Sequence, residues 1–246
     1  MLSIDLNCDM GEGIGNDAAI MPYVSAVNIA CGFHAGDEAT VKQTIKLALQ
    51  HHVAIGAHPG FDDRENFGRL ELQLTNEEVY NLVFKQVMIV QNIAASFHTK
   101  LHHVKPHGAL YNIAANNSGM SAAIAKAVKD IDETLVLYGL NNSYLISEAQ
   151  KVGLATASEV FADRRYNADG SLVGRTKAGA LIEDENMAIQ QVLNMVLRSQ
   201  VISIDNRQVN VNAQTICIHG DGNNAVAFAK KIHETLGKND IIIKTV

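Results

Sequence analysis

The chain has 246 residues and a net charge of −6, with 47% hydrophobic and 19% charged residues. That length suits one α/β barrel spanning residues 1–246, and the composition is that of a globular protein with a sizeable core. The acidic balance argues against a nucleic-acid partner. No stretch approaches the ~20 apolar residues that span a bilayer, so we expect no membrane partner.

Short apolar runs alternate with segments whose apolar residues are three and four positions apart. The strand-like runs are 2–6, 26–31, 53–57, 103–105, 135–138, 156–161, 215–218 and 241–246. Helical spacing occurs at 41–49 after Asp37 as a candidate N-cap, at 79–97 after a capping box of Thr75 and Glu78, and at 187–197 and 225–236. Repeated alternation of strand and helix predicts a parallel α/β architecture.

Two segments interrupt this alternation. Residues 163–177 are rich in Arg, Gly and Asp and predict a long functional loop or a small hairpin. Residues 202–211, with Asp205 and Asn206 at their centre, predict a short hairpin before the penultimate strand. No linker, low-complexity tract or internal repeat divides the chain, so we expect one domain.

The cysteines and the N-terminal segment indicate the compartment. Cys8, Cys31 and Cys217 lie far apart and lack the paired spacing of a zinc site or a disulfide framework. The first residues carry acids where a signal peptide carries basic residues. We therefore expect buried free thiols in a cytoplasmic protein.

Reactive side chains follow the ends of the predicted strands. Four histidines, His34, His58, His107 and His219, follow four different strands. In a parallel α/β barrel those strand ends open on one face, where active sites lie. A lone histidine after a strand is more often structural, but four on one predicted face indicate a site. Other polar residues at these ends are Asn7, Asp9, Glu12, Asp37, Asp62, Asp63, Lys105, Glu159, Asp163, Arg164, Arg165 and Asp221.

These residue types limit the chemistry. Imidazoles and carboxylates act as general acids and bases near neutral pH and as ligands for Zn²⁺. Lysine and arginine could hold an anionic substrate group, although a solvated charged loop explains the arginines equally well on the residues alone. Together they suggest hydrolysis of a small acidic compound. The sequence lacks a GxxxxGK[ST] phosphate loop and a GxSxG nucleophile elbow, and residues 11–15 fit a dinucleotide fingerprint poorly.

Seven segments spread over nearly the whole chain resemble signatures of the LamB/YcsF family. They are DLNCDMGE (5–12), NIACGFHAGD (28–37), IGAHPGF (55–61), VKPHGALY (104–111), EVFADRRY (159–166), LVGR (172–175) and IHGD (218–221). The resemblance implies an irregular, TIM-like parallel β/α barrel of seven strands, of the glycoside hydrolase/deacetylase type. It also implies the A subunit of a bacterial ATP-dependent 5-oxoprolinase, which opens the lactam of 5-oxo-L-proline to L-glutamate.

The implied partners are the B and C subunits, which would use ATP with Mg²⁺ to activate the poorly electrophilic lactam while this chain adds water. The expected catalytic residues are Asp9, His34, His58, His107 and Asp221, and the expected substrate-binding residues are Asn7, Lys105, Arg164, Arg175 and His219. Within these sets, Asp9 and His107 are the preferred acid–base pair, and Lys105 or Arg175 the group that holds the substrate carboxylate.

Two alternatives stay open at the level of sequence. One is a metal-dependent deacetylase of the same fold, with Asp9, His58 and His107 as ligands; the other is a carbohydrate- or carboxylate-binding protein that uses the same face. We expect no essential bound metal, because hydrolysis of an activated lactam does not require one. The sequence leaves a homo-oligomer open.

Overall fold

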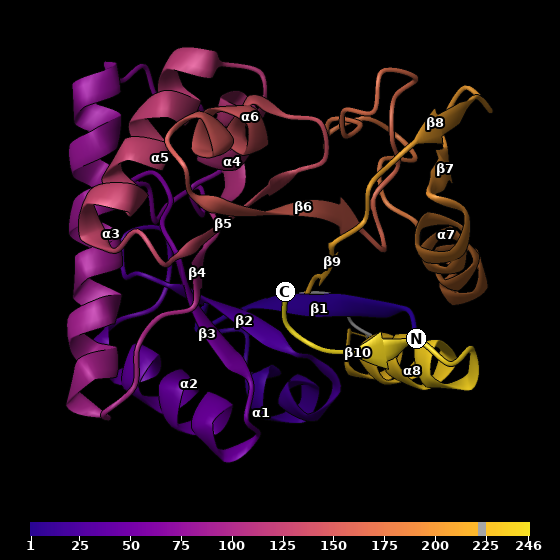
Figure 1. The fold of residues 1–246 in the computed structure, drawn as a ribbon, viewed down its shortest axis with the longest axis horizontal. Helices are drawn as coiled ribbons and strands as arrows, with labels where there is room; N and C mark the ends of the chain where they lie inside the picture. Colours follow the sequence, from indigo (N-terminus) through magenta and orange to yellow (C-terminus); the bar gives the residue numbers. More distant parts are fainter. Residues whose placement is uncertain (221–224) are drawn as a thin grey trace.

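The strands close into a parallel barrel (Figure 1). The computed structural model describes residues 1–220 and 225–246, and within them the barrel order is β1-β2-β3-β4-β5-β6-β9, with β9 pairing back onto β1. The strands are β1 (Ser3–Met10), β2 (Ala26–Ala30), β3 (Ala54–His58), β4 (His103–Val104), β5 (Val136–Leu140), β6 (Ala155–Phe161), β7 (Gln200–Ile202), β8 (Gln208–Asn210), β9 (Thr215–Ile218) and β10 (Ile242–Ile243). The predicted seven-stranded parallel β/α barrel is confirmed.

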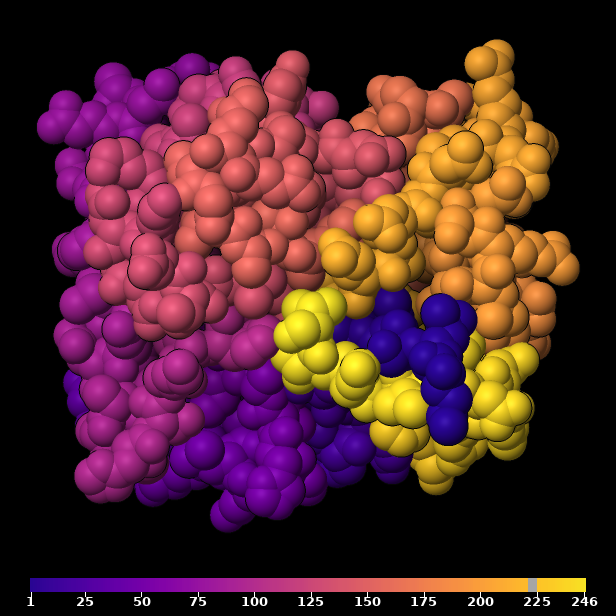
Figure 2. Space-filling model, in the orientation of Figure 1, coloured from indigo at the N-terminus to yellow at the C-terminus, as the bar shows by residue number. Residues whose placement is uncertain are grey.

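The last strand-like run of the sequence lies outside the barrel. It forms β10, which pairs in parallel with Ser3 and Ile4 at the start of β1. The two ends of the chain therefore lie side by side, and Figure 2 shows the indigo N-terminal residues next to the yellow C-terminal ones.

Helices cover the outside of the barrel (Figure 1). They are α1 (Asp17–Ile20), the 3-10 helix η1 (Met21–Tyr23), α2 (Glu38–Gln50), α3 (Asn76–Ser96), α4 (Gly108–Ala115), α5 (Ser118–Ile131), α6 (Tyr144–Lys151), α7 (Glu185–Arg198) and α8 (Ala225–Lys238). Both predicted helix starts are confirmed: Thr75 and Glu78 form the capping box of α3, and Asp37 accepts the Thr40 N–H at the start of α2. Within the described ranges, no helix is long and apolar enough to cross a membrane.

Both segments that interrupt the alternation are hairpins. β7 and β8 pair antiparallel, and Asn206 takes the positive φ of 58° that their tight turn requires. In the segment after β6, antiparallel bridges join Tyr166 to Leu172 and Arg164 to Leu181. This second hairpin follows β6 and contributes residues to the cavity described below.

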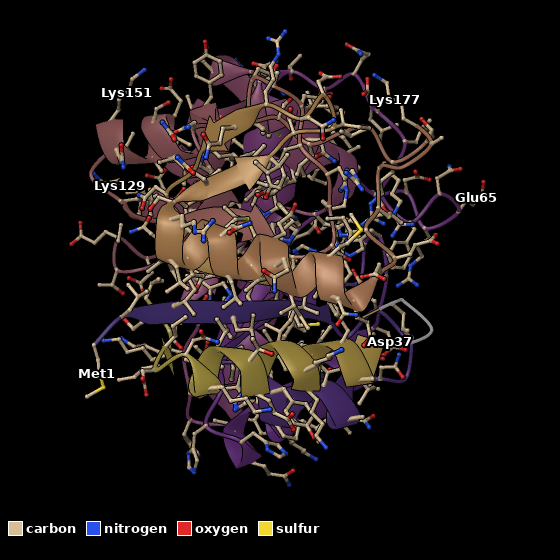
Figure 3. All side chains as sticks on the ribbon, turned by 90° about the vertical axis from the view of Figure 1, so that its right-hand side faces the viewer. Met1, Asp37, Glu65, Lys129, Lys151 and Lys177 are labelled. Carbon is tan, nitrogen blue, oxygen red and sulfur yellow. The ribbon has the colours of Figure 1, made fainter. Side chains whose placement is uncertain are left out.

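Loops that follow the strands gather at one end of the barrel. In Figure 3, Asp37, Glu65 and Lys177, which follow β2, β3 and β6, lie on one side of the molecule. Met1 and Lys151, which precede β1 and β6, lie on the opposite side. All barrel strands are parallel, so this end is the carboxyl end of the strands.

β1 continues to Met10, beyond its predicted end at residue 6, because the interior of the barrel is polar and accommodates the polar residues of this strand. Side chains alternate along a strand, so Leu6, Cys8 and Met10 join the apolar core. The polar residues that alternate with them, Asp5, Asn7 and Asp9, face the opposite side. Asp5 is buried near the start of β1 and accepts hydrogen bonds from Ser25, Tyr138 and Thr215. Polar residues that look like a loop in the sequence are thus strand residues paired inside the barrel.

Candidate functional site

A cavity of about 500 Å³ opens at the carboxyl end of the strands. Its lining includes the predicted site residues Asp9, His58, Lys105, His107, Arg164, Arg175 and His219. Asn7 and His34 are buried and lie outside the lining. Asp221 lies outside the described residues. Histidines from three separate predicted turns thus reach one cavity.

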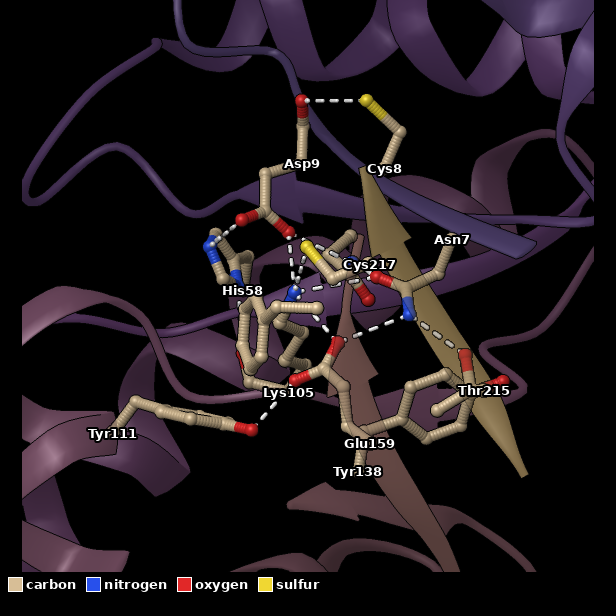
Figure 4. Close-up of polar contacts among 12 residues, drawn as sticks. Asn7, Cys8, Asp9, His58, Lys105, Tyr111, Tyr138, Glu159, Thr215 and Cys217 are labelled. Atoms are coloured by element: carbon tan, nitrogen blue, oxygen red, sulfur yellow. Dashed lines mark hydrogen bonds and ion pairs between the residues drawn. The ribbon is translucent and has the colours of Figure 1, made fainter. Parts of the chain in front are cut away.

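Lys105 is enclosed by acceptors (Figure 4). Its Nζ lies 3.0 Å from Asp9 Oδ1, 2.9 Å from Glu159 Oε1 and 3.2 Å from Asn7 Oδ1, with Cys217 Sγ at 3.1 Å. Burial lowers the pKa of Lys105, but Asp9 and Glu159 outweigh burial and hold the pKa well above 10.5. An ammonium has three protons. While these contacts hold, Lys105 has none left for a substrate carboxylate.

Asp9 is an ionised carboxylate at the floor of the cavity. Its Oδ1 accepts hydrogen bonds from Lys105 and from Asn28 Nδ2 at 2.8 Å, and its Oδ2 lies 3.4 Å from His58 Nε2. Burial raises the pKa of Asp9, but His58 and Lys105 outweigh burial and hold the pKa well below 3.8. With 12% of its side chain exposed, this charge faces the cavity.

The hydrogen bonds of His58 and His107 fix which ring nitrogens carry protons. His58 Nδ1 lies 2.7 Å from the Lys105 carbonyl oxygen, and His107 Nε2 lies 2.9 Å from the Phe67 carbonyl oxygen. A carbonyl oxygen only accepts, so both of these nitrogens are N–H donors. The remaining nitrogens, His58 Nε2 and His107 Nδ1, face each other at 2.9 Å. Two neutral rings would place two lone pairs in contact, so this gap requires a cation, either a proton or a metal ion.

His34 packs behind this pair. Its ring stacks on His107 with 3.8 Å between centroids and 5° between planes, and its Nε2 lies 3.6 Å from Glu12 Oε1. Burial lowers the pKa of His34 to about 3, so the ring is neutral. Gly60 and Gly68 leave room for it, because a Cβ at either position would lie 2.8 Å from a His34 atom.

A second polar group lies beside Asp9, since ligand atoms of Asp9, Cys217 and His219 are within 4.8 Å of one another. His219 Nδ1 lies 2.8 Å from Asp163 Oδ2, and its Nε2 lies 2.8 Å from an Arg175 guanidinium nitrogen. Arginine only donates, so Nε2 is the acceptor and Nδ1–H donates to Asp163. This chain of contacts holds Arg175 at the cavity wall. Arg164 instead points one guanidinium nitrogen at the Val173 carbonyl and is buried.

Sequence reasoning gave no role to three residues that the structure places in this site, although it named Glu12 and Glu159 among the polar residues at the strand ends. Glu12 lines the cavity beside His107, with 3.6 Å between Glu12 Oε1 and His107 Nδ1. Glu159 lies on β6, fully buried, where it pairs with Lys105 and accepts the Tyr111 hydroxyl at 2.7 Å. For Glu159, the sequence feature that could have indicated a role is its position as a charged residue inside an otherwise mostly apolar strand. Tyr111 lies in the segment 104–111, but nothing in its type or spacing indicated a role.

Fold and cavity together define a parallel β/α-barrel protein with an enzyme-like site of carboxylates, imidazoles and arginine. The chain belongs to the LamB/YcsF family, whose family model matches residues 4–246. It is 50% identical over 250 residues to the A subunit of 5-oxoprolinase from Staphylococcus aureus strain bovine RF122 / ET3-1, with all of both chains covered.

Two solved structures show the range of the fold. The lactam utilization protein from Thermus thermophilus is similar over all of both chains, with 39% identity and a TM-score of 0.93. The peptidoglycan deacetylase PdaC from Bacillus subtilis (mutant D285S) covers all of this chain with 88% of its own, at 13% identity and a TM-score of 0.51. The second likeness concerns the fold alone.

Proposed function

We propose that this chain is the A subunit of an ATP-dependent 5-oxoprolinase, which hydrolyses the lactam of 5-oxo-L-proline to L-glutamate. The observation that carries the proposal is the 50% identity to the A subunit of a 5-oxoprolinase over the full length of both proteins. The site supports it, because an ionised carboxylate and an arginine line the same cavity.

The cavity lining offers a partner for each of the two polar groups of this substrate. A five-membered lactam carries one carboxylate and one ring amide. We assign the carboxylate to Arg175, which contacts His219, because guanidinium groups pair with carboxylates through parallel hydrogen bonds. The ring amide then points toward Asp9 and His58.

Asp9 is suited to orient the attacking water and to take its proton. Lys105 and Asn28 hold Oδ1, which leaves Oδ2 facing the cavity beside His58. Water adds to the carbonyl carbon, the bond between that carbon and the ring nitrogen breaks, and the nitrogen receives a proton. His107 as the source of that proton remains a prediction.

ATP enters this proposal through partner subunits. An amide carbonyl is a poor electrophile, and transfer of the terminal phosphoryl group of ATP to its oxygen would make the carbonyl carbon easier to attack. When water has added and the ring nitrogen has left, the product is an acyl phosphate, which a second water hydrolyses to the carboxylate and inorganic phosphate. The sequence contains no phosphate loop, so we assign the phosphoryl transfer to the B and C subunits with Mg²⁺ and ATP in the cytoplasm. A closed complex would protect the labile phosphorylated intermediate from bulk water.

The test is to measure glutamate formed from 5-oxoproline, ATP and Mg²⁺ by the purified chain, alone and with the cognate B and C subunits. We expect turnover only in the complex. Asp9→Asn should lower it by about 10²–10⁴, whereas Asp205→Asn at the β7–β8 turn should not. Full turnover by the isolated chain would refute the partner assignment. Absence of turnover in the complex, with deacetylation of an N-acetylated sugar by this chain, would favour the deacetylase alternative.

A further inference from the structure

Two imidazole nitrogens and a carboxylate oxygen converge on one point of the cavity wall. We propose that Glu12, His58 and His107 bind a divalent metal ion of the zinc class. His58 Nε2 and His107 Nδ1 are 2.9 Å apart, and Glu12 Oε1 lies 3.6 Å from His107 Nδ1. One ligand atom from each of these residues and from His34 lies within 4.8 Å of all the others. Two histidines and one glutamate are a ligand set found in catalytic zinc sites.

The outer hydrogen bonds of the two histidines are those of metal ligands. A ligating histidine usually donates its other ring N–H to a carbonyl or carboxylate, which fixes the tautomer and aims the lone pair. His58 donates to the Lys105 carbonyl and His107 donates to the Phe67 carbonyl. These two hydrogen bonds therefore direct the lone pairs of His58 Nε2 and His107 Nδ1 toward the same point.

The acceptor atoms gathered at this point favour a metal ion over a proton. His58 Nε2, His107 Nδ1 and Glu12 Oε1 are acceptors that face one another. Asp9 Oδ2 adds a fourth acceptor, 3.4 Å from His58 Nε2. A single proton can bridge one pair of these atoms, whereas a divalent cation attracts all of them at once.

His34 is excluded as a ligand in this arrangement by geometry. Its ring plane is within 5° of that of His107, and the two rings are stacked. The lone pairs of an imidazole lie in its ring plane, so those of two parallel rings do not meet at one ion. His34 is 1% exposed, and neither of its ring nitrogens makes a hydrogen bond to any residue that the structure describes. We assign it to holding the His107 ring in place.

This ligand set leaves the ion open to substrate. Glu12, His58 and His107 all line the cavity, so a further coordination position faces the space where the lactam would lie. There an ion would polarise a carbonyl oxygen or lower the pKa of a bound water, with Asp9 adjacent to take the proton. What the ion acts on rests on the proposed function, but its binding does not. This site departs from two sequence-based expectations, that no essential metal is bound and that His107 is the acid. With an ion on His107 Nδ1 and the Phe67 carbonyl on Nε2, the proton for the leaving nitrogen would come from water.

The experiment is metal binding by the full chain after treatment with a chelator. Titration with Co²⁺ should give visible d–d bands that saturate at one ion per chain, and Zn²⁺ should displace it, with metal content measured by atomic emission. Even outer-shell changes alter metal affinity about 10- to 100-fold, so Glu12→Gln and His107→Ala should weaken binding at least about 100-fold. His51→Ala, at an exposed position after α2, should bind like the unmodified chain.

Failure of the unmodified, folded chain to take up Co²⁺ or Zn²⁺ would overturn the metal site and leave a shared proton between His58 and His107. This result does not depend on whether a variant folds. Turnover of 5-oxoproline in the complex with the B and C subunits separates the two proposals. Turnover by a complex in which this chain takes up no ion refutes only the metal site, whereas stoichiometric uptake without ring opening supports the site and refutes the function.

Discussion

Replacing Lys105 by methionine should destabilise the protein by about 3–5 kcal/mol at neutral pH, the usual cost of removing one partner from a buried ion pair. The upper end applies, because Lys105 is paired with both Asp9 and Glu159. Only 3% of the Lys105 side chain is exposed, and Glu159 is fully buried. Methionine has a similar length and packs well, so the loss reports the charge rather than a cavity.

The dependence of this loss on pH tests its cause. Asp9 has a lower pKa in the folded state than its ordinary value of 3.8, so its ionised form stabilises the fold. This contribution is complete above pH 3.8 and is lost as the pH falls below 3.8 through the folded-state pKa. Without Lys105, burial still raises the pKa of Asp9 while one opposing charge is gone. The folded variant then binds a proton more readily. The difference in unfolding free energy between variant and parent should therefore shrink as the pH is lowered toward 3.8.

Urea unfolding followed by circular dichroism at a series of pH values measures this difference. Lys126→Met is a matched control, since Lys126 pairs with Asp130 on the surface, where 63% and 38% of the two side chains are exposed. Exposed pairs contribute little, so the control should change stability slightly at any pH. A loss for Lys105→Met no larger than that of the control, or one that stays constant with pH, would refute the reasoning.

Three further predictions follow from other contacts. Arg175→Ala should raise KM for 5-oxoproline about tenfold or more in steady-state assays of the complex while kcat changes less, because it removes ground-state binding of the carboxylate; an unchanged KM would contradict that role. Tyr111→Phe should cost about 1.5–3 kcal/mol in urea unfolding, because the buried Glu159 loses a donor to a charged group; a loss near zero would show that water replaces the hydroxyl. Thr75→Ala should cost about 1 kcal/mol by thermal unfolding, through loss of the α3 capping box, and an unchanged midpoint would show that the cap is dispensable.

Local patterns predicted the fold because they depend on neighbours in sequence. The capping box of α3, the helix start at Asp37 and the turn at Asn206 were all readable from a few residues. The length of β1 was not. Asn7 and Asp9 resemble a loop in the sequence and are strand residues because partners distant in the chain satisfy them inside the barrel.

The site residues also fall into those that local patterns select and those whose roles depend on distant contacts. His58 and His107 could be selected because they follow strands that end on one face. The role of Glu159 depends on Asn7, 152 positions away, and on Lys105. The residues next to Glu159 in the sequence do not reveal these contacts. Lys105 looked like a substrate-binding cation, but the structure shows that internal acceptors occupy its ammonium. Charge pairing across a barrel is a long-range property.

Closure of the barrel through β1 and β9 determines when the site can form during synthesis. β1 leaves the ribosome long before β9, yet Asn7 of β1 pairs with Cys217 of β9, and the hydrogen bond from Asn7 to Thr215 spans 208 positions. Contacts between such distant positions are slow to form. A nascent chain must therefore carry the charged and amide side chains of its first strand without these partners until most of it has been made. The reaction centre becomes ordered late, and a chain shortened before β9 would hold a barrel that cannot close.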